Sequence, residues 1–431
     1  MKGKVKQAAK KVVLACYHAM AHLLPVRRRV VVFMSSLGRN YTGNPRAICE
    51  EMARQKLTKT FRCYYIFDEP NRFRDELPKG VRPLKNARLF YYLIMAVAGI
   101  WVSDTRFQNY MVKRRKTLYI QTWHGTPLKR LALDLKELHM AGGQSLSEYK
   151  EEFCKNSATW DYLLSQNPFS SAVFRRAFAY RGKILETGYP RNDILCRWNN
   201  IYGRENDPRC KRGEAAGKDS TANMDFPVKK LREQLGIADN KKVMLYAPTW
   251  RDDSYYNEKD YCFGSELDFK KMKEAFGDSY IFVVKYHYMV REEGLNFDTD
   301  FVRAVGDGVD ISGLYLIADL LITDYSSVMF DYSILNRPMY FFAYDLKNYR
   351  DTLRGFYFDF EKEAPGPIVT TTDALIEAIR GHAADGYLEK YRRFVEKYNP
   401  FDDGMAAGEV VEIMKSHSLT QPDRREIEQK K

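Results

Sequence analysis

The segment QTWHGTPLK, residues 121–129, brings together a histidine, a glycine, a hydroxyl and a lysine. The β-branched and apolar residues before it, 117–120, predict a short buried strand. His124 would then follow the carboxyl end of a strand, which is where open α/β sheets bind ligands. Because Gly125 has no side chain, a substrate can approach the backbone closely there. The alternative interpretation is a buried histidine beside a turn.

Two further segments also end a predicted strand with cationic side chains. The apolar run VMLYA stops at Pro248 and is followed by Thr249 and Arg251 in a predicted loop. In the segment IFVVKYHY, four strand residues precede Lys285 and His287. Residues two apart in an extended chain face the same side, so Lys285 and His287 can reach one ligand together.

A fourth segment, ADLLITDYSSVMFDY, combines a predicted strand, turn and helix. The run DLLIT predicts the strand, residues 324–327 a tight turn, and the following residues a helix. The first turn of such a helix offers the hydroxyls of Ser326 and Ser327 together with free backbone N–H groups. A helix start of this kind binds phosphate readily.

Strand-like and helix-like segments alternate along most of the chain, which predicts parallel sheets with helices on both faces. The length of 431 residues favours two domains. A stretch rich in charge, Gly, Asn and Asp separates two alternating series and is typical of a linker or flexible insertion. We therefore predict a helix in residues 1–29, Rossmann-like domains in 30–198 and 229–415, a linker or insertion in 199–228 and a polar tail in 416–431.

The formal net charge of +13 is concentrated near the start, where no acidic residue precedes Glu50. Basic clusters flank the apolar run 12–24, which is shorter than the ~20 apolar residues that a membrane-spanning helix needs. We favour a basic amphipathic helix on an anionic membrane surface, where each Lys or Arg contributes ~1 kcal/mol. A helix packed on the body of the protein and a signal peptide, with a weak cleavage match at 19–21, are the alternatives.

Several classes of function lack their usual sequence signals. The seven cysteines are scattered and form no CxxC pair, so neither a disulfide framework nor a zinc site is predicted. No GxxxxGK loop or strand-linked GxGxxG turn occurs, which leaves ATP-dependent and dinucleotide-dependent chemistry without support. The basic residues form no known nucleic-acid-binding motif. We therefore predict no tightly bound cofactor, no divalent metal and no nucleic-acid partner.

Together with SSLGRNYTGNPRAI near the start and GYPRND at 188–193, the four segments resemble the CDP-glycerol glycerophosphotransferase family. The motifs stand in the family's order and the resemblance covers residues 30–405. It implies a GT-B fold, with the acceptor on the side of domain 30–198 and CDP-glycerol bound by domain 229–415. The implied reaction moves glycerol phosphate from CDP-glycerol to a polyprenyl-diphosphate-linked saccharide or a growing polymer and releases CMP, in teichoic acid synthesis. Because CDP-glycerol is a cytoplasmic metabolite, we expect an enzyme on the inner face of the cell membrane.

The resemblance also assigns roles to single residues. His124 would be the general base for the acceptor hydroxyl, and His287 would steady the pyrophosphate and protonate the departing CMP. Where many relatives have an arginine, this chain has Lys285, which keeps the charge but loses the planar fork of a guanidinium. The remaining predicted substrate-binding residues are Gly125, Thr126, Pro127, Arg191, Pro248, Thr249, Arg251, Ser326, Ser327 and Asp331.

Three other functions remain as alternatives. A ribitolphosphotransferase would use CDP-ribitol, and a GT-B glycosyltransferase would use a nucleotide sugar with a similar phosphate site and histidine base. The third alternative is a scaffold on the membrane surface that has the same fold but no catalytic activity. The presence of both histidines and both serines, His124, His287, Ser326 and Ser327, speaks against the scaffold, since a scaffold needs none of them.

Overall fold

A computed structural model gives the fold of most of the chain. It describes residues 2–137, 145–202, 228–249, 255–257, 260–261, 266–285, 298–306, 308–346 and 355–419. The predicted site residues Arg251 and His287 lie outside these ranges.

The first half of the chain forms a seven-stranded sheet in which every neighbouring pair is parallel. Its central strands are almost fully buried, as expected for parallel strands covered on both faces. The order of the strands reverses between β1 and β4, which makes their carboxyl ends the topological switch point. In sheet order the strands are β3 (Val81–Lys85), β2 (Arg62–Phe67), β1 (Arg27–Met34), β4 (Ala98–Ser103), β5 (Leu118–Gln121), β6 (Tyr162–Ser165) and β7 (Lys183–Glu186).

The second half forms a six-stranded sheet, also parallel throughout. Its order reverses between β8 and β13, so this sheet repeats the doubly wound arrangement of the first. The predicted α/β class with two Rossmann-like units is confirmed. In sheet order the strands are β12 (Val302–Val305), β11 (Tyr280–Lys285), β8 (Lys242–Ala247), β13 (Leu320–Thr323), β14 (Met339–Phe342) and β15 (Ile368–Val369), and a separate hairpin pairs β9 (Tyr255–Asn257) with β10 (Asp260–Tyr261).

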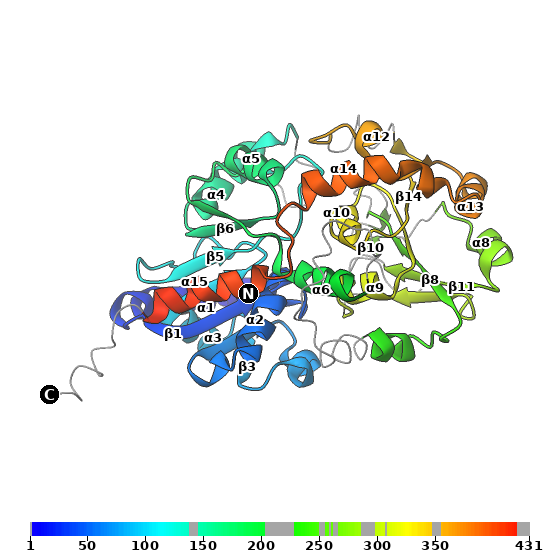
Figure 1. The fold of residues 1–431 in the computed structure, drawn as a ribbon. Helices are drawn as coiled ribbons and strands as arrows, with labels where there is room; N and C mark the ends of the chain where they lie inside the picture. Colours follow the sequence, from blue (N-terminus) through cyan, green and yellow to red (C-terminus); the bar gives the residue numbers. More distant parts are fainter. Residues whose placement is uncertain are drawn as a thin grey trace.

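Helices cover both faces of each sheet (Figure 1). On the first sheet one face packs against α1 (Lys2–Leu23), α3 (Leu89–Val97), α4 (Leu146–Ser157) and α5 (Pro168–Ala177), and the other against α2 (Gly43–Arg54) and α15 (Ala406–Leu419). On the second sheet one face packs against α6 (Asp193–Tyr202), α9 (Ile311–Ile317), α10 (Val328–Tyr332), α12 (Phe360–Glu363) and α14 (Leu388–Tyr398), and the other against α8 (Phe269–Phe276) and α13 (Thr372–Arg380).

Short 3-10 helices occupy several of the connections. They are η1 (Ser36–Gly38), η2 (Leu57–Lys59), η3 (Pro70–Glu76), η4 (Ala132–Asp134), η5 (Pro190–Asn192), η6 (Ser333–Leu335) and η8 (Ala383–Tyr387).

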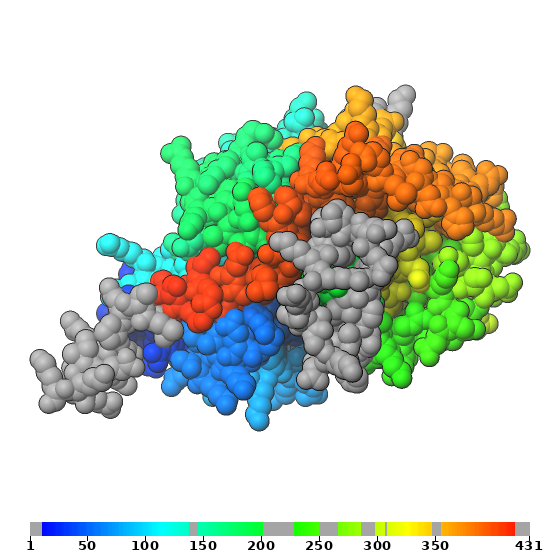
Figure 2. Space-filling model, in the orientation of Figure 1, coloured from blue at the N-terminus to red at the C-terminus, as the bar shows by residue number. Residues whose placement is uncertain are grey.

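The two units face each other across a cleft. A cavity of about 1000 Å³ lies between them, lined by α2 and η5 from the first unit and by α9 from the second. Near the C-terminus the chain crosses back, because α14 packs on the second sheet whereas α15 packs on α2 and β1 of the first. Figure 2 shows α15, in red, lying on the surface formed by the first half of the chain. The predicted domain boundaries stay a prediction.

The N-terminal helix α1 ends at Leu23, before the predicted end at residue 29, because residues 27–29 already belong to β1; the helix packs on α3. Tyr17 and Ala21 are fully buried in this contact. The hydroxyl of Tyr17 accepts a hydrogen bond from the backbone N–H of Val112 at 2.9 Å. The second half of the helix is therefore part of the protein body. In the part of the chain that the structure describes, no helix has the length and apolar character needed to cross a membrane.

Candidate active site

The loop after β5 holds His124 in a fixed backbone conformation. Trp123 adopts the left-handed conformation, with φ at 51°. Its backbone N–H donates to Oε1 of Gln121 at 2.9 Å, which closes the turn directly behind the strand. The Trp123 indole is buried, and the His124 imidazole stacks on it with ring centroids 4.3 Å apart. His124 therefore follows the carboxyl end of β5, as predicted.

The hydrogen bond of the His124 ring fixes which nitrogen is free. Nδ1 lies 3.0 Å from the backbone carbonyl oxygen of Asp104. A carbonyl oxygen only accepts, so Nδ1 carries the proton and Nε2 keeps its lone pair. Desolvation by the surrounding protein lowers the pKa of His124, the nearby charge of Arg191 lowers it further, and the bond to Asp104 acts in the opposite direction. One side of the side chain remains exposed to solvent. The ring is thus a neutral imidazole suited to accept a proton through Nε2.

The pKa shift of His124 predicts a pH profile. If the neutral imidazole is the base, kcat/KM falls as the pH drops through the pKa of His124. Because that pKa is lowered, we expect the acidic limb below the ordinary histidine value of ~6.5, with a plateau at neutral pH. The measurement is kcat/KM between pH 5 and 8, with the donor substrate that the family resemblance implies. An acidic limb centred above pH 7 contradicts the assignment.

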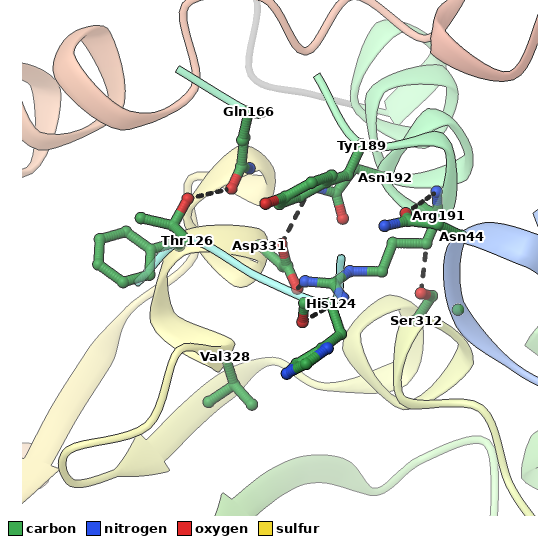
Figure 3. Close-up of polar contacts among 12 residues, drawn as sticks. Asn44, His124, Thr126, Gln166, Tyr189, Arg191, Asn192, Ser312, Val328 and Asp331 are labelled. Atoms are coloured by element: carbon green, nitrogen blue, oxygen red, sulfur yellow. Dashed lines mark hydrogen bonds and ion pairs between the residues drawn. The ribbon is translucent and has the colours of Figure 1, made fainter. Parts of the chain in front are cut away.

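Arg191 and Asp331 form a buried ion pair between the two units (Figure 3). Nη2 of Arg191, in η5, donates to Oδ2 of Asp331, in α10, at 2.6 Å. Their side chains are only 10% and 4% exposed. Nη1 of Arg191 also donates to the backbone carbonyl of His124 at 2.7 Å, and Asn192 donates to the second carboxylate oxygen of Asp331 at 3.1 Å. Both predicted substrate-binding side chains are thus bonded to each other, and through Arg191 to the histidine loop.

Thr126 lies in an interior network of polar side chains. Its hydroxyl donates to Oε1 of Gln166 at 2.7 Å and lies within hydrogen-bond distance of Asn167 and Ser170. Thr126 is 2% exposed, and Pro127 beside it is buried as well. The network holds the segment after His124 on α5.

The same network reaches the crossover segment, residues 399–405, which connects α14 of the second unit to α15 on the first. Gln166 donates to Oδ2 of Asp402 at 2.9 Å, and Asn192 donates to Oδ1 at 3.2 Å. Burial raises the pKa of Asp402 to about 6, although the bonds from Gln166, the Tyr189 amide and Asn192 lower it. Asp402 therefore ties the crossover segment to η5 and to the loop before α5.

The predicted residues of the second unit gather at the carboxyl edge of its sheet. Thr249 and Pro248 follow β8, and the backbone N–H of Thr249 donates to Oδ1 of Asp324, directly after β13, at 2.8 Å. These two strands form the topological switch point. Lys285 is the last residue of the neighbouring strand β11, and its Nζ donates to the carbonyl of Gly306 at 2.5 Å. The structure therefore brings these predicted residues to one edge of the sheet.

The two units also lie close together at Gly125. A Cβ atom added to Gly125 would lie 3.2 Å from Oγ of Ser327 and 3.5 Å from Nη2 of Arg191. Ser326 and Ser327 are half-buried in the turn before α10. A side chain at position 125 would crowd the Ser327 hydroxyl, and the φ of 154° is one that other residues rarely adopt, so glycine is favoured where the two loops meet.

Three buried amide side chains that connect these loops are not among the predicted site residues. Asn44, Gln166 and Asn192 are buried and each bonds to a segment distant in the chain. Asn44 lies in the motif SSLGRNYTGNPRAI and Asn192 in GYPRND, so membership in these motifs could have identified both residues as site candidates. Asp324 was predicted only as part of a turn. In the described part of the chain, no group of three or more histidine, cysteine or acidic side chains is placed to hold a metal ion.

Comparisons with known proteins agree on one family. The family model described as CDP-Glycerol:Poly(glycerophosphate) glycerophosphotransferase matches residues 16–207 and 218–416. The teichoic acid poly(glycerol phosphate) polymerases of Bacillus subtilis (strain 168) and Bacillus spizizenii (strain W23) are each 38% identical to this chain over 418 residues. These matches cover 95% and 96% of this chain, and 52% and 99% of the respective relatives. The chain thus spans about half the length of the Bacillus subtilis polymerase.

A solved structure of the wall teichoic acid polymerase TagF matches with a TM-score of 0.82 and 34% identity, covering 97% of both chains. Relatives named for ribitol phosphate are more distant. The teichoic acid ribitol-phosphate primase of Bacillus spizizenii is 28% identical over 425 residues, covering 96% of this chain and 98% of the relative.

Proposed function

Because the chain belongs to the CDP-glycerol:poly(glycerophosphate) glycerophosphotransferase family, we propose that it transfers glycerol phosphate from CDP-glycerol and releases CMP. The acceptor is a hydroxyl of a growing poly(glycerol phosphate) chain or of a lipid-linked saccharide. The observation that carries this proposal is the neutral imidazole of His124, whose Nε2 bonds to none of the described residues, beside the loop that approaches the serine turn of the other unit. CDP-ribitol is not favoured as donor, because the relatives named for ribitol phosphate are less similar than those named for glycerol phosphate.

In the proposed reaction, Nε2 of His124 takes the proton of the acceptor hydroxyl. The acceptor oxygen forms a bond to the β-phosphorus that carries glycerol, and the bond from that phosphorus to the bridging oxygen breaks. CMP leaves with the electron pair, and His287 supplies a proton to it. Cations and hydrogen-bond donors stabilise the charge that develops on the phosphates. We assign this work to Lys285, Arg251 and the hydroxyls of Ser326 and Ser327.

Arg191, Asp331 and Thr126 take a different part in the proposal. The guanidinium of Arg191 is bonded to Asp331 and to the His124 carbonyl, and the Thr126 hydroxyl is bonded in the interior. We propose that these side chains position the histidine loop against the donor-binding unit. We propose that Gly125, Pro127, Pro248 and Thr249 contribute backbone to the substrate site at the strand ends of the two units.

The test is turnover by the purified protein with labelled CDP-glycerol and a synthetic lipid-linked acceptor. We expect CMP release together with acceptor products extended by glycerol phosphate units. Parallel reactions contain CDP-ribitol or a UDP-sugar as the donor. Turnover of the UDP-sugar without turnover of CDP-glycerol would refute the proposal and favour a glycosyltransferase.

We further propose that the protein binds the cytoplasmic face of the membrane through α1 and α3. Five of the eight large apolar side chains that are exposed among the described residues lie on these two helices, which pack together. They are Val12 (63% exposed), Leu23 (82%), Leu89 (69%), Phe90 (53%) and Leu93 (36%). The basic residues Lys11, Arg27, Arg29 and Arg88 are exposed on or beside the same elements. An apolar surface with a basic border favours an anionic lipid surface.

A double variant tests this surface without removing the buried part of α1. We expect Leu89→Glu with Phe90→Glu to weaken binding to anionic vesicles at least about tenfold, since each apolar side chain contributes ~1.5 to 3 kcal/mol when buried. Binding of the wild-type protein should also weaken as salt rises. The matched control is Leu388→Glu, on α14 of the second unit, where the leucine is 61% exposed. Equal sedimentation of the double variant, the control and the wild type with vesicles would refute the surface.

A further inference from the structure

The side chain of Asn44 connects three segments of the site and belongs to none of the predicted site residues. Asn44 is the second residue of α2 and is fully buried. Its Nδ2 donates to the backbone carbonyls of Thr122 at 3.2 Å and Trp123 at 3.1 Å. Its Oδ1 accepts from the backbone N–H of Arg191 at 3.2 Å (Figure 3). One carboxamide thus uses both its donors and its acceptor.

The nitrogen and the oxygen of the carboxamide both bond to residues that position His124. Thr122 and Trp123 directly precede the histidine, and Trp123 holds a left-handed conformation that positions the ring. Arg191 in turn donates to the His124 carbonyl and to Asp331 of the other unit. Asn44 therefore fixes the distance between the histidine loop and the ion pair that joins the units.

The residue before Asn44 also contacts the second unit. The backbone N–H of Gly43 donates to Oδ2 of Asp310, the N-cap residue of α9, at 3.0 Å. The start of α2 is thus bonded to the histidine loop, to η5 and to α9. A shift of α2 would move His124 relative to the donor-binding unit.

We propose that Asn44 is a positioning residue, which holds the His124 base and the Arg191–Asp331 pair in the relative placement that transfer requires. The role of Asn44 rests on the proposed function. Only a carboxamide fits, because the two carbonyls need donors and the Arg191 amide needs an acceptor. An ionised carboxylate would face two carbonyl oxygens. An apolar side chain would remove the described partner of the Thr122 carbonyl and of the Arg191 amide, and would leave the Trp123 carbonyl only its bond from the Thr122 hydroxyl.

The test compares kcat and the KM for CDP-glycerol in Asn44→Ala and Asn44→Asp. We expect Asn44→Ala to lower kcat about 10- to 100-fold, because misplacing a reacting group by about 1 Å has effects of this size. The KM for CDP-glycerol should change less than about threefold, because the described hydrogen bonds of Asn44 all go to residues of the first unit. Asn71→Ala and Asn71→Asp, at an exposed asparagine, are the matched controls.

The isosteric variant Asn44→Asp gives a readout that a purely structural role would not produce. The carboxyl group that this substitution introduces is buried, so its pKa is raised, and its protonated form can donate to one carbonyl while accepting from Arg191. The activity of Asn44→Asp, divided by that of the wild type at the same pH, should therefore rise as the pH falls from 8 to 6. A ratio independent of pH, or an Asn44→Ala variant with kcat within about twofold of wild type, overturns the proposal.

A second measurement does not depend on turnover. Hydrogen exchange of residues 121–126 should be faster in Asn44→Ala than in the wild type, because the loop loses its two carbonyl bonds. If the wild-type protein releases no CMP from CDP-glycerol, the proposed function fails, whereas unchanged exchange in this segment refutes the positioning role alone.

Discussion

We expect the His124→Ala variant to release CMP from CDP-glycerol at least about 100-fold more slowly than the wild-type protein. A positioned general base contributes ~10² to 10⁴ in rate, and alanine offers no atom to replace Nε2. The fold should survive, because one side of the imidazole is exposed and its one described hydrogen bond is to a backbone carbonyl. Single-turnover release of CMP at saturating donor is the measurement.

His382→Asn provides the control for this experiment. His382 is exposed in the second unit and adopts a left-handed conformation that asparagine tolerates. Its turnover should equal that of the wild type. If His124→Ala keeps more than about a tenth of the wild-type rate at neutral pH, another group takes the proton and the role of His124 must be reassigned.

The sheets could be predicted because buried parallel strands appear in the sequence as continuous apolar runs. The segments RVVVFM, YYIF, VMLYA and IFVV all form central strands. Strand β3 cannot be recognised in this way, because its sequence VRPLK is short, charged and interrupted by Pro83. Such a strand is stable only at a sheet edge, which is where β3 lies.

The candidate site was predictable only in part, because local sequence shows where strands end but not which side chains meet in the folded protein. Residues that follow the ends of strands can be recognised from local sequence, and His124, Thr249 and Lys285 all stand at such ends. Which side chains contact each other depends on tertiary structure. Arg191 and Asp331 are 140 residues apart, and nothing in their local sequences indicates a pair. Asn44 resembles an ordinary loop residue until its partners, 78 to 147 residues away, are known.

The pairing of Arg191 with Asp331 leads to a prediction about stability. Asp331→Asn should lower the free energy of unfolding by about 3 to 5 kcal/mol, because it leaves the Arg191 guanidinium buried without a counter-charge. The substitution keeps the volume of the side chain, so loss of charge is the main change. Both side chains are almost inaccessible to water, which therefore cannot replace the lost partner. Urea denaturation followed by tryptophan fluorescence is the measurement.

Two variants separate the buried charge from other effects. Asp373→Asn removes one partner of the exposed pair between Lys271 and Asp373, and it should change stability little, because solvent already screens that pair. The double variant Arg191→Met with Asp331→Leu should recover most of the stability lost in Asp331→Asn, since replacing a whole buried pair by apolar side chains is often neutral. The double variant should still turn over CDP-glycerol slowly, because the His124 carbonyl has lost its bond to Arg191. Wild-type stability in Asp331→Asn would show that the pair is open to solvent in solution and that the two units separate there.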